Sequence, residues 1–108
     1  MTIGEIGPAG QGDAVALRIE GEMTIYRAAE LKDVLAGAVA QAVAETRALA
    51  LDLSDVTEFD SAGVQLLLLA RREAQRQGQV LRLEACSPAV REVFHLTGLT
   101  ARFAAEDA

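Results

Sequence analysis

The sequence predicts a single α/β domain with a mixed, mostly parallel β-sheet of four to five strands, packed with three to four helices. Short apolar segments that alternate like strands are separated by longer segments with helical apolar spacing, in the order β-β-α-β-α-β-α. The chain has 108 residues, 51% of them hydrophobic, which is enough for one domain with its own core and too few for two. Helices between successive strands imply parallel pairing.

Composition divides the chain into three parts. Residues 1–13 contain four glycines and one proline with little apolar content, and we expect a flexible leader there. The domain then spans residues 14–103. Residues 104–108 are expected to form a frayed tail.

The first strand is predicted where Val15, Leu17 and Ile19 alternate with less apolar residues. Gly21 breaks the alternation, and residues 22–25 are predicted to form a short second strand. These two strands are expected to supply the antiparallel pair of the sheet.

An apolar stripe at helical spacing predicts the first helix. Its members recur at i, i+3, i+4, i+7, i+8 and i+11 and are Leu31, Val34, Leu35, Ala38, Val39 and Ala42. The segment 48–53 that follows is short and almost wholly apolar, which favours a buried central strand. Residues 54–60 are polar and acidic and are expected to form a loop. A second helix is predicted to begin at Ser61, to be the most enclosed of the three, and to stop near Gly78.

The last strand and helix are predicted from residue 80 onward. Apolar residues at 80–85 indicate a strand, and Ser87-Pro88 has the pattern of an N-cap followed by the first helical residue. This helix is expected to end at Gly98, with Leu99 as the hydrophobic contact after it. Residues 100–103 are interpreted as a possible edge strand. The side chains expected to point inward from this helix are Val90, Val93, Phe94 and Thr97.

Charge and composition exclude several classes of function. Sixteen acidic and ten basic residues give a net charge of −6 without a positive block, which argues against a nucleic-acid partner. The single cysteine, Cys86, excludes an internal disulfide and a Cys-rich zinc site. The longest apolar run, residues 66–70, is far shorter than the ~20 residues of a membrane span. With no visible secretory signal, we expect a cytoplasmic protein that does not insert into a membrane.

The stretch from residue 51 to residue 64 is the one that points to a function. Asp60 fits as the N-cap of the second helix, which leaves Ser61 with its hydroxyl facing solvent, where unpaired amides and the helix dipole favour an anion. Ala62 and Gly63 are small, so another protein's surface could approach closely. An Asp-Ser pair also caps helices with no further role. The stretch contains no base, and its acids are Asp52, Asp55, Glu58 and Asp60.

Four segments together resemble the STAS family, the anti-sigma-factor antagonists and their relatives. They are Leu51–Ser54, Phe59–Gly63, Ser87–Val90 and Leu96–Leu99, and the likeness in their order and spacing covers roughly residues 14–103. The resemblance implies a STAS-like fold and a protein-binding module with no catalytic activity and no cofactor.

The resemblance also implies residue roles. In antagonist members a partner kinase, which is also the anti-sigma factor, phosphorylates the serine of an Asp-Ser-x-Gly motif. By position Ser61 is the acceptor, Asp60 the adjacent carboxylate and Gly63 the close-approach residue. Glu58 and Ala62 belong to the same expected partner-binding surface. The expected partner is a kinase-type anti-sigma factor or a related signalling ATPase.

Two departures from the antagonists leave a second interpretation open. The family often has an aspartate just after the Gly-Glu turn, where this chain has Met23 and Thr24, and Thr24 is polar without the charge. The C-terminus is also short. Both features resemble STAS subunits found with lipid-transport ABC systems or in chemotaxis-type signalling complexes. There the domain would be a constitutive scaffold for an ABC-transporter ATPase, with Ser61 never modified.

Enzymatic and metal-binding alternatives have little support in the sequence. The only histidine, His95, belongs to a different helix from Ser61, and no Gly-x-Ser-x-Gly elbow is present. The acids lack the spacing of a calcium loop and there is no phosphate-binding loop motif. Weak nucleotide binding, reported for some STAS domains, stays open. Tyr26 is either an interface anchor or is packed under the first helix, and Cys86 is interpreted as a small buried hydrophobe.

Overall fold

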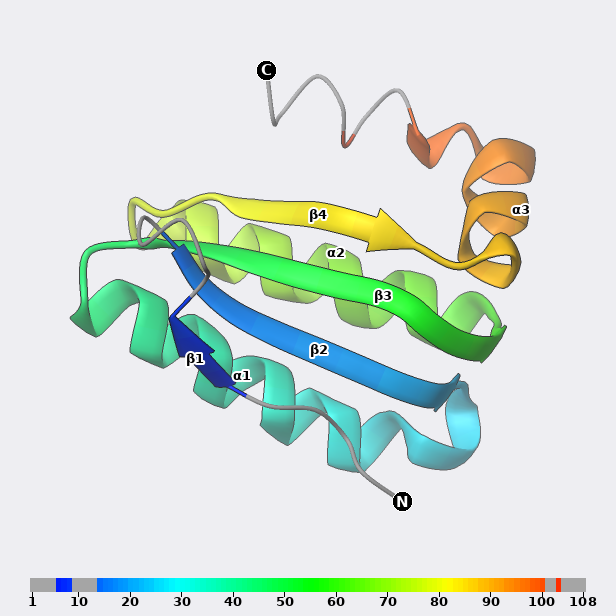
Figure 1. Cartoon of the computed structure of the whole chain (residues 1–108), viewed down its shortest axis with the longest axis horizontal. Coiled ribbons are helices and arrows are strands. Elements are labelled where there is room, and N and C mark those ends of the chain that lie inside the picture. Colours follow the sequence, from blue (N-terminus) through cyan, green and yellow to red (C-terminus); the bar gives the residue numbers. More distant parts are fainter. Residues whose placement is uncertain (1–5, 9–13, 101–102, 104–108) are drawn as a thin grey trace.

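A four-stranded sheet in the order β1-β2-β3-β4 is the centre of the fold (Figure 1). The computed structural model describes residues 6–8, 14–100 and 103. Strand β1 pairs antiparallel with β2, whereas β2 pairs parallel with β3 and β3 parallel with β4. The strands are β1 (Ile6–Pro8), β2 (Ala14–Met23), β3 (Ala48–Phe59) and β4 (Leu81–Cys86).

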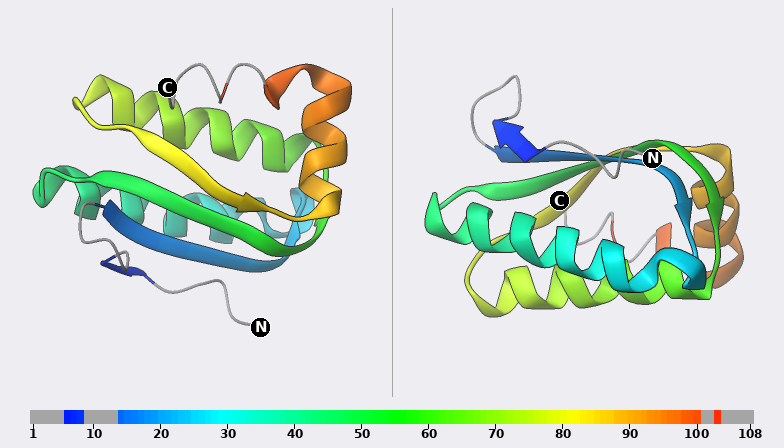
Figure 2. Two further views of the ribbon diagram at one scale, coloured as in Figure 1. Left: turned by 45° about the horizontal axis from the view of Figure 1, so that its top comes forward. Right: turned by 90° about the horizontal axis from the view of Figure 1, so that it is seen from below.

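Two long helices cover one face of this sheet, and a third closes one end (Figures 1 and 2). The helices are the 3-10 turn η1 (Ile25–Arg27), α1 (Ala28–Ala44), α2 (Ser61–Arg76) and α3 (Pro88–Thr97). Because β2, β3 and β4 are parallel, their carboxyl ends meet at one edge of the sheet, which we call the carboxyl edge. The turn η1 follows β2 there, and α2 and α3 begin there.

The core lies between the sheet and the pair α1 and α2. The predicted stripe of α1 is confirmed, since five of its residues are buried and Val34 packs against them. On α2 only one side faces the sheet, so Leu69 is half-exposed although Leu66 and Leu67 are buried. None of the helices in the described ranges has the length and hydropathy of a membrane span. The largest fully buried side chains include Leu17, Ile19, Leu31, Leu49, Leu51, Leu53, Leu67 and Leu81.

The predicted element order is confirmed, but the antiparallel strand is not the predicted one. Residues 22–25 do not form a separate strand, because β2 continues through Gly21 to Met23 beside β3. A register shift just after Gly21, whose φ is 82°, lets the strand continue in spite of the glycine. Residues Ile6–Pro8 of the predicted leader supply the antiparallel pair instead. The rest of that leader and the predicted tail lie outside the described residues.

Strand β3 is twice as long as predicted. The prediction of a loop at residues 54–60 is wrong for all of them except Asp60. Residues 54–59 continue the parallel pairing with β2, and the last pair joins Met23 and Phe59. The backbone pairing satisfies the strand while most of the polar side chains stay exposed and Val56 is buried. The long strand carries the acidic segment out to the carboxyl edge.

The predicted caps of α3 are confirmed. The Ser87 hydroxyl accepts a hydrogen bond from the Val90 amide at 3.3 Å, and Pro88 is the first helical residue. Gly98 takes the left-handed conformation with φ 77°, and Leu99 is buried. Proline and the left-handed glycine therefore set the two ends of the helix.

Two expectations near the C-terminus are wrong. Thr97 is exposed rather than inward-facing, and its hydroxyl donates to the Val93 carbonyl at 2.7 Å, which satisfies it on the helix itself. The predicted edge strand at 100–103 is helical at its two described residues. Phe103 is buried there, with its ring stacked 5.3 Å from that of Phe94. Phe103 therefore packs against α3 instead of extending the sheet.

Candidate functional site

The predicted site residues Thr24, Asp60 and Ser61 meet at the carboxyl edge. Thr24 follows the last residue of β2, and Asp60 joins β3 to α2 (Figure 1). The Asp60 amide donates to the Met23 carbonyl at 3.4 Å, which holds the ends of the two strands together. The parallel topology thus brings together residues that are more than thirty positions apart in the chain.

Asp60 is the N-cap of α2, as predicted, and its carboxylate also binds the turn η1. Its Oδ1 accepts from the amides of Ala62 at 2.9 Å and Gly63 at 3.4 Å, which satisfies two of the free donors of the helix N-terminus. Its Oδ2 accepts from the amide of Ile25 at 3.3 Å. One carboxylate therefore ties the start of α2 to the turn η1.

Ser61 is exposed as the first residue of α2. No side chain of the described residues donates to or accepts from its hydroxyl. The helix is 16 residues long, so the positive end of its dipole lies next to this hydroxyl and favours a negative charge there. The position is accessible to another protein and suited to carry an anion.

Gly63 is buried against its own chain. A Cβ built on it would lie 2.6 Å from Phe59 Cε1 and 2.7 Å from the Met23 carbonyl oxygen. The glycine therefore allows α2 to begin directly above the ends of β2 and β3. Ala62 is only partly buried, so of the two small residues it is the one that another protein could contact.

Thr24 is buried and caps the turn η1. Its hydroxyl oxygen accepts from the Tyr26 amide at 3.3 Å, while the hydroxyl donates to Glu22 Oε1 at 3.0 Å. Only 7% of Thr24 is exposed. Because its polar group is used within the chain, Thr24 shapes the edge of the site more than it presents a free group.

The acidic stretch divides into two groups with different surroundings. Asp55 forms an ion pair with Arg18 at 2.7 Å. Asp52 accepts from the hydroxyl of Ser54 at 2.6 Å and from its amide at 2.9 Å, and these hydrogen bonds lower the pKa of Asp52. The stretch itself contains no base, but in the fold the charge of this part is offset, because β2 supplies a cation that is distant in sequence.

The second group of acids lies at the carboxyl edge. Glu58 is exposed on β3 and is the register partner of Glu22 on β2. Asp60 follows at the end of the same strand. No ion pair within the described part of the chain reaches any of these three carboxylates. The surface beside Ser61 therefore keeps its negative charge.

The structure excludes one of the two interpretations of Tyr26 and adds a neighbour that the sequence did not indicate. Tyr26 is 89% exposed, so it is not packed under α1. Ile25 is 69% exposed. The sequence did not indicate Ile25 as a surface residue, because residues 22–25 were predicted to form a short strand.

The other candidate groups lie apart from Ser61 or lack a ligand set. His95 is exposed on α3, and no hydrogen bond among the described residues connects it to Ser61. Within residues 6–8, 14–100 and 103, no three His, Cys, Asp or Glu side chains gather in a way that could hold a metal. Cys86 is half-buried, and burial raises the pKa of its thiol, which disfavours the nucleophilic thiolate form.

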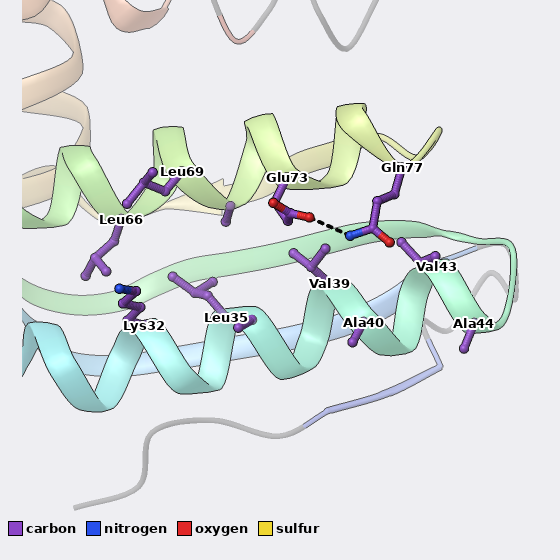
Figure 3. Close-up of a pocket in the computed structure, with 12 residues that line it drawn as sticks. Lys32, Leu35, Val39, Ala40, Val43, Ala44, Leu66, Leu69, Glu73 and Gln77 are labelled. Atoms are coloured by element: carbon purple, nitrogen blue, oxygen red, sulfur yellow. Dashed lines mark hydrogen bonds between the residues drawn. The ribbon is translucent and has the colours of Figure 1, made fainter.

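A groove of about 530 Å³ runs between α1 and α2 on the side away from the sheet (Figure 3). Leu35, Val39, Leu66 and Leu69 point into it, and Lys32 lies at one end. At the other end Gln77 donates to Glu73 at 2.6 Å. The lining is largely apolar and offers little for chemistry.

Asp60→Ala should destabilise the fold by about 0.5–2 kcal/mol, the usual range for the loss of an N-cap. The substitution removes the acceptor for two α2 amides and for the Ile25 amide. Urea denaturation measures the effect. The matched control is Asp55→Ala, which removes an exposed ion pair and should change the stability by less than about 1 kcal/mol. Equal effects of the two substitutions would contradict the role given to Asp60.

Comparison with known proteins assigns the family. The family model described as Mlab, STAS domain matches residues 6–103. An anti-sigma factor antagonist from Mycobacterium paratuberculosis is similar at 25% identity and a TM-score of 0.76, over 93% of this chain and 80% of that chain.

Two further solved structures share the fold. The phosphorylated form of the Bacillus cell fate determinant SpoIIAA has 22% identity and a TM-score of 0.61, over 91% of this chain and 86% of that one. An antisigma-factor antagonist STAS domain from Rhodobacter sphaeroides has 23% identity and a TM-score of 0.53, over 74% of this chain and 82% of that one. The chain belongs to the STAS domain family.

Proposed function

We propose that this chain is a protein-binding regulatory domain of the anti-sigma-factor-antagonist type, with no catalytic activity of its own. Its partner is a kinase-type anti-sigma factor or a related signalling ATPase, which phosphorylates Ser61. The observation that carries the proposal is the exposed Ser61 hydroxyl at the first position of α2, beside a carboxylate cap.

The proposed switch acts through charge. A phosphate on Ser61 adds about −1.5 to −2 charges at pH 7. It would stand beside Asp60 and near Glu58, whose charges no cation of the described residues offsets. In the proposed complex the partner's basic groups pair with Asp60 and Glu58, so a partner that covers this surface would have to desolvate the added phosphate without a further cation, at a cost of several kcal/mol. The unmodified form is therefore the one that binds.

The neighbouring structures support this proposal. SpoIIAA, described as an anti-sigma factor antagonist, is known in an unphosphorylated form that aligns with 85% of this chain and in a phosphorylated form that aligns with 91%. The same fold thus occurs in that protein with and without the modification. A switch at Ser61 needs no change of fold, only a change of charge at the docking surface.

A constitutive scaffold for an ABC-transporter ATPase is the second candidate. Thr24 favours it, because its hydroxyl is used by the Tyr26 amide and by Glu22 and does not replace the charged residue that antagonists often have there. In such a complex the same surface would bind its partner permanently. Ser61 would then stay unmodified.

Intact-mass analysis of the chain purified from its native cells separates the two functions. The switch predicts a second species heavier by one phosphoryl group, which maps to the peptide containing Ser61 and disappears after phosphatase treatment. The unmodified mass alone under every growth condition would favour the scaffold. Modification at another serine, such as the exposed Ser54, would also contradict the assignment.

Association with the partner should slow as salt rises. The edge carboxylates Glu22, Glu58 and Asp60 would attract a basic surface, and the screening length falls from about 30 Å at 0.01 M to about 3 Å at 1 M salt. Stopped-flow association rates over this range provide the measurement. Rates that do not depend on salt would show that these carboxylates do not guide docking.

A further inference from the structure

We infer that Ile25 and Tyr26 form the apolar anchor of the docking surface, and that the partner protein presents an apolar pocket bordered by basic groups. This inference rests on the proposed function, because it places the partner on the surface next to Ser61. It adds the residues that provide the binding energy and the chemistry of the surface that receives them.

Exposure is the first observation. Ile25 and Tyr26 are 69% and 89% exposed, and they are adjacent in a turn of only three residues. A single exposed apolar side chain needs no explanation, whereas two large ones side by side next to a functional site mark an interaction surface. Tyrosine is among the residues that dominate binding energy at protein interfaces.

The turn that carries these side chains is fixed by its own hydrogen bonds. The Tyr26 amide donates to the Thr24 hydroxyl at 3.3 Å, and the Arg27 amide donates to the Thr24 carbonyl at 3.0 Å. The Ile25 amide donates to Asp60 Oδ2 at 3.3 Å. A backbone held in place before binding loses little conformational entropy when the partner arrives.

Arg27 holds the other end of the same turn. Its side chain is only 10% exposed, and Nη1 donates at 3.2 Å to the carbonyls of both Glu20 and Glu22 at the end of β2. Nε lies 3.2 Å from Glu30 Oε1 on α1. Burying a guanidinium costs desolvation free energy, which its charge-assisted hydrogen bonds offset. These bonds join the end of β2 to α1 and so fix the position of the turn that carries Ile25 and Tyr26.

The negative charge around the turn indicates which kind of protein binds there. Glu22, Glu58 and Asp60 lie around the base of the turn, and no ion pair in the described part of the chain neutralises them. A second copy of this chain in a two-fold dimer would place identical carboxylates against each other, which is unfavourable. The chemistry that fits is a different protein with an apolar pocket for Tyr26 and basic groups around it.

The Asp60 carboxylate also connects the anchor to Ser61. The same side chain that accepts from the Ile25 amide caps the helix on which Ser61 is the first residue. The anchor and the modification site are therefore parts of one continuous surface. A phosphate at Ser61 would therefore stand within the area that the partner covers.

The test is a titration with the protein that the full chain retains from its native cells, purified after identification by mass. Tyr26→Ala should weaken its affinity at least ~10-fold, and Ile25→Ala should weaken it in the same direction. The matched control is Leu96→Ala on α3, because Leu96 is 74% exposed and thus comparable in exposure. This control should stay within about 2-fold of wild type. Melting temperatures check that the variants are folded.

The outcomes separate this inference from the proposed function. Wild-type affinity of Tyr26→Ala and Ile25→Ala, with a weakened Ser61→Asp, overturns the anchor and leaves the switch intact. A weakened Tyr26→Ala with an unaffected Ser61→Asp supports the anchor and overturns the switch. Loss of affinity only with Leu69→Ala moves docking to the groove between α1 and α2. Retention of no protein, or self-association that Tyr26→Ala abolishes, contradicts the occupant.

Discussion

Ser61→Asp is expected to weaken partner binding at least ~10-fold, about 1.4 kcal/mol, with an almost unchanged melting temperature. The folded state should tolerate the new charge, because the N-terminus of α2 stabilises an anion by about 0.3–1 kcal/mol and the nearby Asp60 and Glu58 oppose it. The bound state should not tolerate it, because the interface would bury a carboxylate with no cation supplied for it by this chain. Calorimetric titration and thermal denaturation measure the two quantities separately.

Two variants control for this result. Ser61→Ala should bind like the unmodified protein, since it keeps a small neutral side chain at the same position, and it should lock the chain in its binding form. Ser54→Asp makes the same chemical change at an exposed position earlier on β3 and should have a much smaller effect on affinity. Equal weakening by both aspartates would mean that net charge, and not position, determines binding.

Gly63→Ala is expected to lower the free energy of unfolding by about 1–3 kcal/mol, the range for overpacking in a well-packed site. The added Cβ would meet the Phe59 ring at 2.6 Å and the backbone carbonyl of Met23 at 2.7 Å. The carbonyl belongs to the end of β2 and cannot rotate away. The Phe59 ring is limited by Phe94, whose ring centre is 6.1 Å from its own.

The same chemical change on α1 is the control for this prediction. A Cβ on Gly37 would meet no atom within 4 Å, so Gly37→Ala should stabilise the protein by about 0.5–1 kcal/mol because alanine is the better helix former. Urea denaturation of both variants measures the difference. Wild-type stability of Gly63→Ala would show that α2 moves easily at its start and that Gly63 has no packing role.

Most of the fold could be predicted because its signals are local. The apolar stripe of α1, the Asp60 and Ser87 caps and the left-handed Gly98 are each specified by a few neighbouring residues. The errors arose where a partner distant in sequence decides the structure. β3 runs on to Phe59 because β2 lies beside it, and Ile6–Pro8 becomes a strand through its pairing with β2.

The site shows the same division. Ser61 and its cap were predicted from the order of residues along the chain. The ion pair between Arg18 and Asp55 and the bond from the Ile25 amide to Asp60 span 37 and 35 residues, so no local pattern indicates them. The need for glycine at position 63 also comes from a distant segment, because a side chain there would meet the Met23 carbonyl at the end of β2. Contacts between distant segments were therefore the part that needed the structure.

The most direct test of the central claim uses phosphate itself. The purified partner is titrated with the chain carrying phosphoserine at position 61, and again after a phosphatase has removed the phosphate. The proposal predicts an affinity at least ~10-fold lower for the phosphorylated chain, full recovery after treatment, and the same fold in both samples. Equal affinity before and after treatment would contradict a switch at Ser61.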